Sequence, residues 1–406
     1  MAELDRRSLL QSGAAAALAI AAPGMARADD TTGISATEIK IGSTTSLSGP
    51  VSALGIQDRV QEAFFRMINE QGGVAGRKIK YLYYDDGFQP PKTVEQVRRL
   101  IESDEVAFLF NMLGTAPNSA VVDYINKKQV PHLFLSVNGD KWGDYQKYPW
   151  TLPFAPSARI ESQIYAKYAL AQNPKAKFAI LYQNDDLGKD YVAGVRDVLG
   201  ADFDARAKAV PHEVTDPTID SQIATLKASD ADVLLSGTTA KFAAQSIKRA
   251  FDIQWKAMHF IASGAASITG AINPAGPEKA VGVISSAYVK DANDPQWAND
   301  KGVADYTAFM QKYFPEGNPK DAYCIYAYTV ALVLMQIFKQ CGDKLTRENI
   351  MAQANNLRDL EIPTLLPGVK VNTSPTNHHP LRQVQLQRWE GAGWKRFGDI
   401  IQGAQL

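Results

Sequence analysis

Val106-Ala107-Phe108-Leu109-Phe110-Asn111 is an apolar run of the kind that forms a strand buried on both faces of a parallel sheet. The loop that follows, Met112-Leu113-Gly114-Thr115-Ala116-Pro117, leads into a predicted helix over residues 116–128. A second predicted strand covers residues 131–136. A buried strand, a short loop, a helix and another strand make up the repeating unit of an α/β domain. This stretch therefore predicts a doubly wound parallel sheet.

The same alternation extends along the chain in both directions. Upstream, strands are expected at residues 38–43 and 78–85, with a helix between them. A proline-rich extended stretch at residues 148–156 interrupts the pattern, which then restarts with strands near 177–182, 233–236, 259–263 and 281–286. Helices are expected at 301–313, 321–339 and 347–356, and short strands at 369–371, 384–389 and 394–397. Because 406 residues exceed what one hydrophobic core usually serves, we expect two α/β domains.

The first 28 residues have the pattern of a signal peptide. Arg6 and Arg7 precede a largely apolar segment over residues 9–22, and Ala26-Arg27-Ala28 offers small residues at the cleavage positions. The apolar segment is shorter than the roughly 20 residues that cross a bilayer. The sequence therefore predicts cleavage near Ala28 and a mature protein outside the cytoplasm. The arginine pair leaves general and twin-arginine export both open.

Composition and cysteine spacing exclude several classes of protein. The chain has 43 Lys and Arg against 43 Asp and Glu, so the basic excess typical of nucleic-acid-binding proteins is missing. After residue 28, no run of 18 consecutive apolar residues indicates a membrane anchor. Cys324 is expected within a helix and Cys341 just beyond its end. That spacing separates them by about 25 Å, whereas a disulfide needs Cα atoms within about 7 Å. Two unpaired thiols are predicted.

Catalytic motifs are missing from the sequence. It contains no G-x-S-x-G, no G-x-x-x-x-G-K-[ST], no H-E-x-x-H and no C-x-x-C. His378-His379 could be half of a metal site, but the other histidines are scattered, so solvated loop residues are the favoured interpretation. The sequence therefore predicts a protein that is not an enzyme and that carries no cofactor and no metal.

Small polar loops follow several predicted strands, where open α/β sheets place their ligands. Gly114 permits close backbone approach, and Thr115 offers a hydroxyl next to the free amides of a helix start, which favour a carboxylate. Alternatively, Thr115 only caps its helix. Residues 136–140 form a similar loop, and residues 183–188 and 237–239 are the matching loops of the second unit. Asp185 could bind a ligand or cap the following helix. Facing polar loops without a nucleophile favour binding over catalysis.

Several motifs together resemble a known family. These are Ile39-Lys40-Ile41-Gly42, Ser46-Leu47-Ser48-Gly49-Pro50, Gln71-Gly72-Gly73-Val74-Ala75-Gly76, Tyr84-Asp85-Asp86 with Pro90-Pro91-Lys92, and Leu181 through Asp190. In this order they resemble the Leu/Ile/Val-binding-protein family of periplasmic solute-binding proteins, which serve ABC importers. The resemblance implies a type I periplasmic-binding-protein fold, with two lobes joined by three crossovers that close over a ligand. The expected lobes are residues 29–154 plus 287–364 and residues 155–286 plus 365–406.

The resemblance also implies a set of ligand-binding residues. In amino-acid-binding members, loops matching Gly114-Thr115 and Asn138-Gly139-Asp140 hold the α-carboxylate. Ser263 stands roughly where such members place the carboxylate that pairs with the ammonium, and Leu187 where they place an aromatic residue. Leu54 stands near a position that is often tryptophan. The predicted ligand-binding residues are Leu54, Gly114, Thr115, Asn138, Gly139, Asp140, Asp185, Leu187, Thr238, Thr239 and Ser263.

A carboxylate without an ammonium group, such as an aromatic acid, is the expected ligand, because burying an unpaired ammonium is unfavourable. The expected partners are an inner-membrane ABC permease and its ATPase, and the expected state is a free monomer in the periplasm. A branched-chain amino acid is the alternative ligand, with Asp185 taking the ammonium. A ligand sensor of a signalling complex and an exported hydrolase are the alternatives from other classes.

Overall fold

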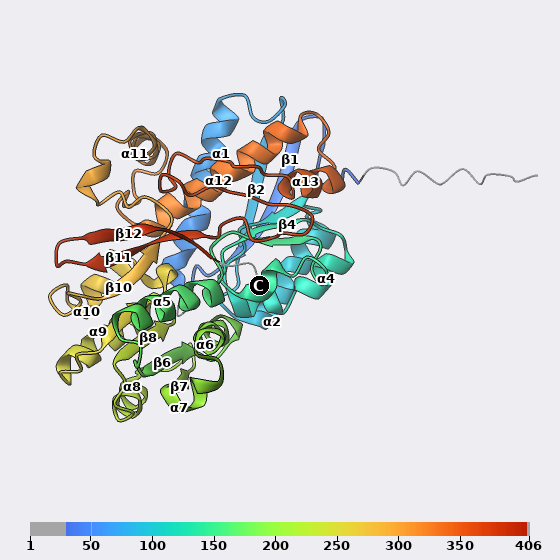
Figure 1. Ribbon diagram of the computed structural model, residues 1–406. Coiled ribbons are helices and arrows are strands. Elements are labelled where there is room, and N and C mark those ends of the chain that lie inside the picture. The colour runs from blue at the N-terminus through green and yellow to red at the C-terminus, as the bar shows by residue number, and fades with distance from the viewer. Residues whose placement is uncertain (1–29, 50, 404–406) are drawn as a thin grey trace, which may run out of the picture.

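The computed structural model describes residues 30–49 and 51–403. The predicted signal peptide and its cleavage position lie outside the described residues. The described chain forms two α/β lobes, each built around its own sheet (Figure 1).

The first lobe contains a five-stranded parallel sheet with the order β2-β1-β3-β4-β5. Its strands are β1 (Glu38–Thr45), β2 (Lys78–Asp85), β3 (Phe108–Phe110), β4 (His132–Leu135) and β5 (Thr151–Pro153). Its helices are α1 (Ile56–Glu70), α2 (Pro90–Arg98), α3 (Thr115–Ser119) and α4 (Val122–Lys127). The buried strand β3 lies in the middle of the sheet, as its apolar sequence predicts.

The second lobe contains a seven-stranded sheet with the order β12-β11-β10-β9-β8-β6-β7. Five strands are parallel, namely β6 (Phe178–Gln183), β7 (Ala207–His212), β8 (Val233–Gly237), β9 (Met258–Ile261) and β10 (Ile284–Ala287). The strands β11 (Gln383–Trp389) and β12 (Trp394–Gln402) add an antiparallel edge. The accompanying helices are α5 (Ala158–Gln172), α6 (Asp186–Leu199), α7 (Phe203–Arg206), α8 (Asp220–Lys227), α9 (Ala240–Asp252) and α10 (Asn273–Ala275).

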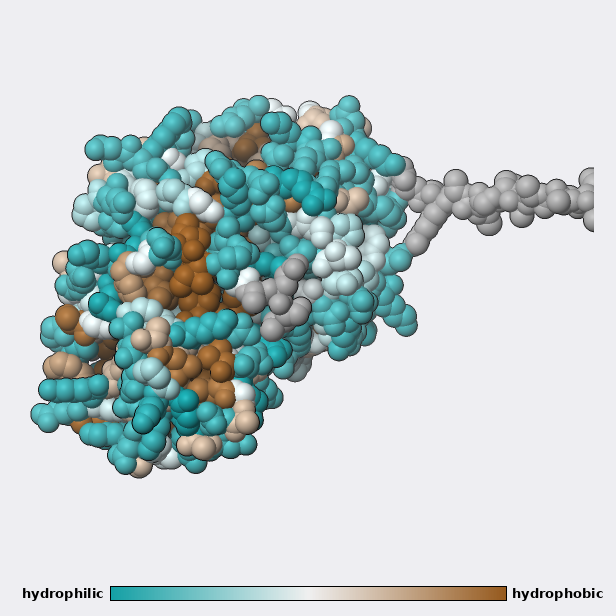
Figure 2. All heavy atoms as spheres, in the orientation of Figure 1, coloured by the Kyte–Doolittle hydropathy of each residue, from teal (hydrophilic) through white to brown (hydrophobic). Residues whose placement is uncertain are grey.

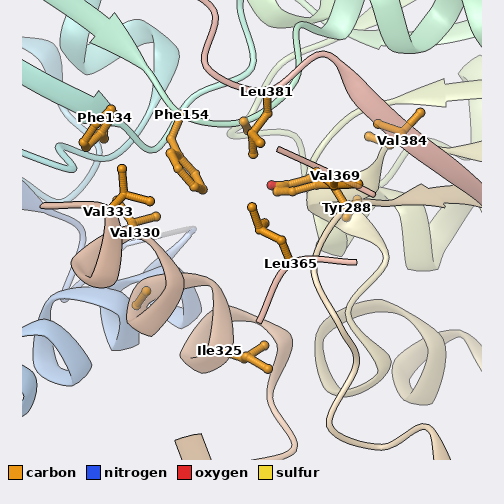
Figure 3. Packing of buried hydrophobic residues seen from close by; sticks show 14 of the residues in the cluster. Phe134, Phe154, Tyr288, Ile325, Val330, Val333, Leu365, Val369, Leu381 and Val384 are labelled. Carbon is orange, nitrogen blue, oxygen red and sulfur yellow. The ribbon is translucent and has the colours of Figure 1, made fainter. Parts of the chain in front are cut away.

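The chain passes between the lobes three times. After β10 it returns to the first lobe, where α12 (Ala322–Cys341) lies beside α1 and is followed by α13 (Arg347–Ala354) (Figure 1). The helix α11 (Lys301–Tyr313) also packs against α1, and the chain then returns to the second sheet as β11 and β12. Phe154, Tyr288 and Leu365, one from each crossing segment, are buried in a single apolar cluster (Figure 3). The predicted fold class is confirmed, and the lobe boundaries at residues 154, 287 and 365 stay predictions.

Two local predictions are wrong, and two elements were not predicted. The helix expected over residues 116–128 is two helices, because the backbone at Val121 leaves the helical region (φ −124°, ψ −14°). Residues 369–371 form no strand, and Val371 makes only an isolated bridge to Leu360. The strand β7 and the helix α8 were not expected. β7 contains Pro211 and only short apolar residues, which is a weak strand signal compatible with its place at the sheet edge.

The helix α12 supplies much of the core of the first lobe. Among the described residues, it is the one helix long and apolar enough to cross a membrane. Most of its side chains are buried, and the Tyr328 ring packs edge-on against Phe64 of α1 at 5.4 Å. Cys324 and Cys341 are buried and unpaired as predicted, although Cys341 is the last residue of the helix instead of lying beyond it. Burial within the protein therefore accounts for the apolar sequence of α12.

Candidate functional site

A cavity of about 200 Å³ lies between the two lobes. Its walls come from the loops after β2, β3 and β4 in the first lobe and after β6, β8 and β9 in the second. These loops stand at the carboxyl ends of parallel strands, where open α/β sheets bind ligands. On the face shown in Figure 2, hydrophobic residues gather in the middle of the molecule, between the upper and lower lobes, while the periphery is mostly hydrophilic.

Nine of the eleven predicted ligand-binding residues line this cavity. They are Leu54, Gly114, Thr115, Asn138, Asp185, Leu187, Thr238, Thr239 and Ser263. Gly139 and Asp140 are not among the lining residues. Gly139 faces the indole of Trp142. Thus the structure brings together most of the predicted set, and binding by each residue stays a prediction.

Asp140 connects the two lobes beside the cavity. Its backbone N–H donates to Oδ2 of Asp190 at 2.6 Å, and its Oδ1 accepts a hydrogen bond from Ser157 Oγ at 2.5 Å. Asp190 belongs to α6 of the second lobe. These partners engage the Asp140 carboxylate and backbone outside the cavity, so its place in the structure is between the lobes and not in the cavity wall.

The loop around Gly114 requires glycine. Its φ of 92° is one that other residues rarely adopt, and a Cβ there would lie 2.4 Å from the Phe88 ring. Gly114 is also the N-cap of α3, and Thr115 is the first residue inside the helix. The alternative that Thr115 caps its helix is therefore wrong, because no side chain caps α3. The Thr115 hydroxyl is positioned at the cavity wall.

Further polar groups of the first lobe were missed by sequence analysis. Ser136 Oγ donates to Gln57 Oε1 at 2.9 Å, which leaves the Gln57 amide nitrogen as a donor at the cavity wall. Tyr326 also lines the cavity, and its buried hydroxyl lies beside the side chains of Asn111 and Ser136. Thr115 and Gln57 thus give the first-lobe wall a hydroxyl and an amide nitrogen as hydrogen-bond donors.

Asp185 both caps a helix and lines the cavity. Its Oδ1 accepts from the backbone N–H of Gly188 at 3.1 Å, and its Oδ2 accepts from Gln183 Nε2 at 2.6 Å. Burial raises the pKa of Asp185 above its ordinary value despite these hydrogen bonds. Asp185 therefore caps a helix and also lies in the cavity wall.

The other charged residues of the wall, Lys290 and Asp291, have protein partners. Lys290 Nζ lies 2.7 Å from Asp300 Oδ2 and donates to the Pro363 carbonyl at 2.7 Å. Asp291 accepts hydrogen bonds from the backbone and side chain of Asn293, and burial raises its pKa. The positive charge at the wall is thus already paired with a carboxylate.

Glu161 lies directly behind the second-lobe wall and was not predicted. It is 1% exposed. Its carboxylate accepts hydrogen bonds from Ser286 Oγ at 2.5 Å, from the backbone N–H of Ser263 at 3.1 Å, and from the Tyr191 hydroxyl. All three donors belong to residues that line the cavity. In the sequence, Glu161 stands four residues before Tyr165, so both side chains lie on the same buried side of α5.

Six aromatic side chains line the cavity, and none of them was predicted as a ligand-binding residue. They are Phe88, Tyr191, Tyr288, Tyr323, Tyr326 and Trp394. These residues come from a loop, two helices, a crossing segment and an edge strand. Apart from Tyr323 and Tyr326 of α12, they are far apart in the sequence, so only the folded chain brings them together.

Hydrogen bonds and an ion pair join the lobes on either side of the cavity. Lys141 Nζ of the first lobe lies 2.5 Å from Asp186 Oδ2 of α6. The Tyr323 hydroxyl of α12 donates to the Gly264 carbonyl at 3.2 Å. In this structure, the lobes therefore meet around the cavity.

His378 and His379 lie away from the cavity wall. His378 is 2% exposed, and its Nδ1 donates to the Thr151 carbonyl at 2.9 Å. The His379 ring packs against Gly143 and lies 3.8 Å from Asp140. The interpretation of these histidines as solvated loop residues is therefore wrong. Within the described ranges, no group of three or more His, Cys, Asp or Glu side chains is arranged to hold a metal ion.

Residues 38–394 match the family model described as periplasmic binding protein. The chain belongs to this family. Over 251 residues it is 26% identical to the Leu/Ile/Val-binding protein homolog 4 of Brucella abortus (strain 2308). That match covers 58% of this chain and spans 57% of the relative's length. The predicted family resemblance is confirmed.

Solved structures share the fold across nearly the whole chain. A branched chain amino acid ABC transporter from Thermus thermophilus with bound valine has a TM-score of 0.80 and 14% identity, covering 91% of this chain and 98% of that chain. A fatty acid ABC transporter substrate-binding protein from Thermomonospora curvata has a TM-score of 0.76 and 19% identity, covering 92% and 95%. These two proteins are described with different ligands, so the shared fold does not select a ligand class.

Proposed function

We propose that this protein is an exported, non-enzymatic solute-binding protein of the periplasm that binds a small organic carboxylate between its lobes. An aromatic acid is the favoured ligand, to be delivered to an inner-membrane ABC permease and its ATPase. The observation that carries the proposal is the interlobe cavity, with hydrogen-bond donors on one wall and six aromatic side chains around it. A pocket with many apolar contacts and few polar groups is typical of a small-molecule binding site.

The polar groups of the first lobe suit the carboxylate. Thr115 offers a hydroxyl and Gln57 offers an amide nitrogen at the cavity wall. Hydrogen bonds to a charged acceptor are roughly twice as strong as those between neutral groups. The aromatic side chains then offer flat apolar surfaces to the rest of the ligand.

A branched-chain amino acid is the second candidate, favoured by Asp185. This carboxylate lines the cavity and has a raised pKa, so a ligand ammonium would meet a group that lacks a cationic partner among the described residues. Asp185 already accepts two hydrogen bonds from the protein, yet each of its oxygens retains a second lone pair. The two candidates therefore differ in whether Asp185 pairs with the ligand.

A thermal-shift screen of the purified protein tests the proposal. The ligands are benzoate, cinnamate, leucine, valine and a medium-chain fatty acid. Binding at about 100 times Kd stabilises a protein by about 2.7 kcal/mol, which is readily measured. We expect stabilisation by the aromatic acids and none by leucine or valine. Stabilisation by leucine alone would instead support the amino-acid candidate, and stabilisation by none of the five would reject carboxylate binding.

Two variants connect any stabilisation to the cavity. Thr115→Val removes the wall hydroxyl with little change in shape, and we expect about a tenfold loss of affinity for the aromatic acid. Thr225→Val is the matched control, because Thr225 is exposed on α8 and its hydroxyl bonds the Ser221 carbonyl. Equal losses in the two variants would contradict binding at the cavity.

A further inference from the structure

Each of four polar residues of the second-lobe wall directs a hydrogen atom into the protein. The first is Gln183, which is 3% exposed and donates through Nε2 to Asp185 Oδ2. This bond fixes the orientation of the amide. Its Oε1 is buried, belongs to a cavity-lining residue and has no hydrogen-bond partner within the described residues. Gln183 therefore presents an acceptor that the protein leaves unsatisfied.

The second residue is Thr238, whose proton is directed by His212. His212 Nδ1 lies 3.0 Å from the Glu213 carbonyl, which can only accept, so Nδ1 carries the hydrogen. Burial lowers the pKa of His212 and favours the neutral ring, in which Nε2 is then an acceptor. The Thr238 hydroxyl must donate to this Nε2, at 2.6 Å. Thr238 lines the cavity, and its hydroxyl proton is not available to a ligand, so its oxygen can act there only as an acceptor.

The third and fourth residues are Tyr191 and Ser286, whose protons are directed by Glu161. A carboxylate only accepts hydrogen bonds, so both hydroxyls donate to it. Ser286 Oγ also accepts from Tyr165 at 3.2 Å. Glu161 is not a cavity-lining residue, yet it determines which part of each hydroxyl can meet a ligand.

These residues lie close together at the carboxyl end of the second sheet. The last residue of β6 is Gln183, and Thr238 directly follows the neighbouring strand β8, with Tyr182 paired to Gly237. The Tyr191 ring packs on Gly237, where a Cβ would lie 2.6 Å away. We call Gln183, Tyr191, Thr238 and Ser286 the acceptor patch.

We propose that the ligand presents a hydrogen-bond donor, a hydroxyl or an N–H group, to the acceptor patch, with its carboxylate held by the first lobe. This inference rests on the proposed function and names the ligand more narrowly, as a carboxylate that also carries a hydrogen-bond donor. Glu161 and His212 act as positioning residues that set the polarity of the patch. A site built to hydrogen-bond a ligand hydroxyl strongly rejects the analogue without it, because the buried acceptors then remain unpaired.

Calorimetry with matched ligand pairs tests the inference. The first pair is 4-hydroxycinnamate and 4-methoxycinnamate, and unsubstituted cinnamate serves as a size control. We expect the hydroxylated acid to bind at least tenfold more tightly than either analogue. Leucine and 4-methylpentanoate form the second pair, which differs by the amino group. A preference for leucine in this pair alone would support the patch and identify the donor as an ammonium group.

Variants of the positioning and patch residues test the mechanism. Glu161→Gln can donate from its amide to Ser286 or Tyr191, which turns a hydroxyl proton towards the cavity. We expect the preference for the donor-bearing ligand to fall at least fivefold. Thr238→Val removes one acceptor without disturbing Glu161 and should lower the same preference if the first variant fails to fold. Glu62→Gln is the control, because this exposed glutamate accepts a hydrogen bond from the Tyr83 hydroxyl and neither residue lines the cavity.

The outcomes separate this inference from the proposed function. If carboxylates bind but both pairs show equal affinities, the acceptor patch does not select a donor and the inference is wrong while the proposed function stands. A preference that is present but unchanged in both variants would also overturn the assignment to these residues. If no carboxylate of either pair binds, the proposed function itself fails, and the inference fails with it.

Discussion

The two walls of the cavity are built in different ways. In the first lobe, the wall depends on backbone shape, since Gly114 brings the chain against Phe88 and places Thr115 at the start of α3. In the second lobe, the wall depends on buried polar groups. Glu161 and His212 lie behind the wall and accept hydrogen bonds from the hydroxyls of lining residues. The comparison shows that one binding surface can be shaped by sterics and the other by hydrogen-bond direction.

The largest effect is expected from removing the buried carboxylate behind the second wall. Glu161→Ala leaves the hydroxyls of Tyr191 and Ser286 and the N–H of Ser263 without their acceptor. Breaking such a buried network should lower the free energy of unfolding by about 4 kcal/mol, as measured by urea denaturation. The control Glu62→Ala removes an exposed carboxylate bonded to Tyr83 and should lose less than about 1 kcal/mol. Similar losses of stability in the two variants would show that the buried network of Glu161 contributes no more than an exposed hydrogen bond.

The steric wall is tested by Gly114→Ala. We expect the free energy of unfolding to fall by about 3 kcal/mol, because alanine would adopt an unfavourable φ and its Cβ would clash with Phe88. Gly72→Ala separates the two causes, since Gly72 has a φ of 105° and no atom within 4 Å of its Cβ position. In urea denaturation, the free energy of unfolding of this control should fall by about 1 kcal/mol. Equal losses would remove the Phe88 contact from the explanation.

The stability of the protein should depend on pH through Asp190, which lies where the two walls meet. Burial raises the pKa of this carboxyl to about 7, and the charges of Asp140 and Asp186 add to the effect while Arg159 opposes it. The folded state therefore holds this proton over a range where the unfolded chain has lost it. Stability from this group is fully present below pH 4 and is lost as the pH rises towards 7.

Asp190→Asn removes that titration while keeping an oxygen that can accept from Asp140. Urea denaturation at pH 5 and pH 8 measures the change. Between these pH values, the free energy of unfolding of the variant should fall by about 2 kcal/mol less than that of the parent. Other buried groups, including Asp58 with a pKa raised by burial to about 6, contribute equally to both proteins. Identical pH profiles for the variant and the parent would contradict the assignment to Asp190.

The smallest effect is expected at the rim, where the walls meet through an ion pair. Lys141→Ala removes the contact with Asp186, and both side chains are partly exposed. A pair of this kind contributes about 0.5 kcal/mol, so ligand affinity should fall about twofold at low salt and less at high salt. Lys301→Ala, which breaks an exposed pair within α11, should leave ligand affinity unchanged. A tenfold effect at Lys141 would show that the rim contributes more than a surface ion pair.

The same contrast explains how much of the site could be read from the sequence. Gly114, Thr115 and Thr238 were found because they follow predicted parallel strands, and the position of such loops depends on the order of elements. Gly139 and Asp140 satisfied the same rule but lie outside the cavity wall, because the loop after β4 turns towards α6. Glu161 follows no strand and stands in an ordinary helical position, so local patterns could not identify it.

The sequence by itself determined the alternation of strands and helices, the two lobes and the loops that face each other. These follow from local hydrophobic periodicity and from the rule that parallel strands end at the same edge of a sheet. Only the tertiary structure decided which aromatic residues surround the cavity and which way its hydroxyl protons point. Such features depend on contacts between residues far apart in the chain, as with Glu161 and Ser286 or His212 and Thr238. The direction of a hydroxyl proton is set by the acceptor packed behind it, and that acceptor is placed by folding.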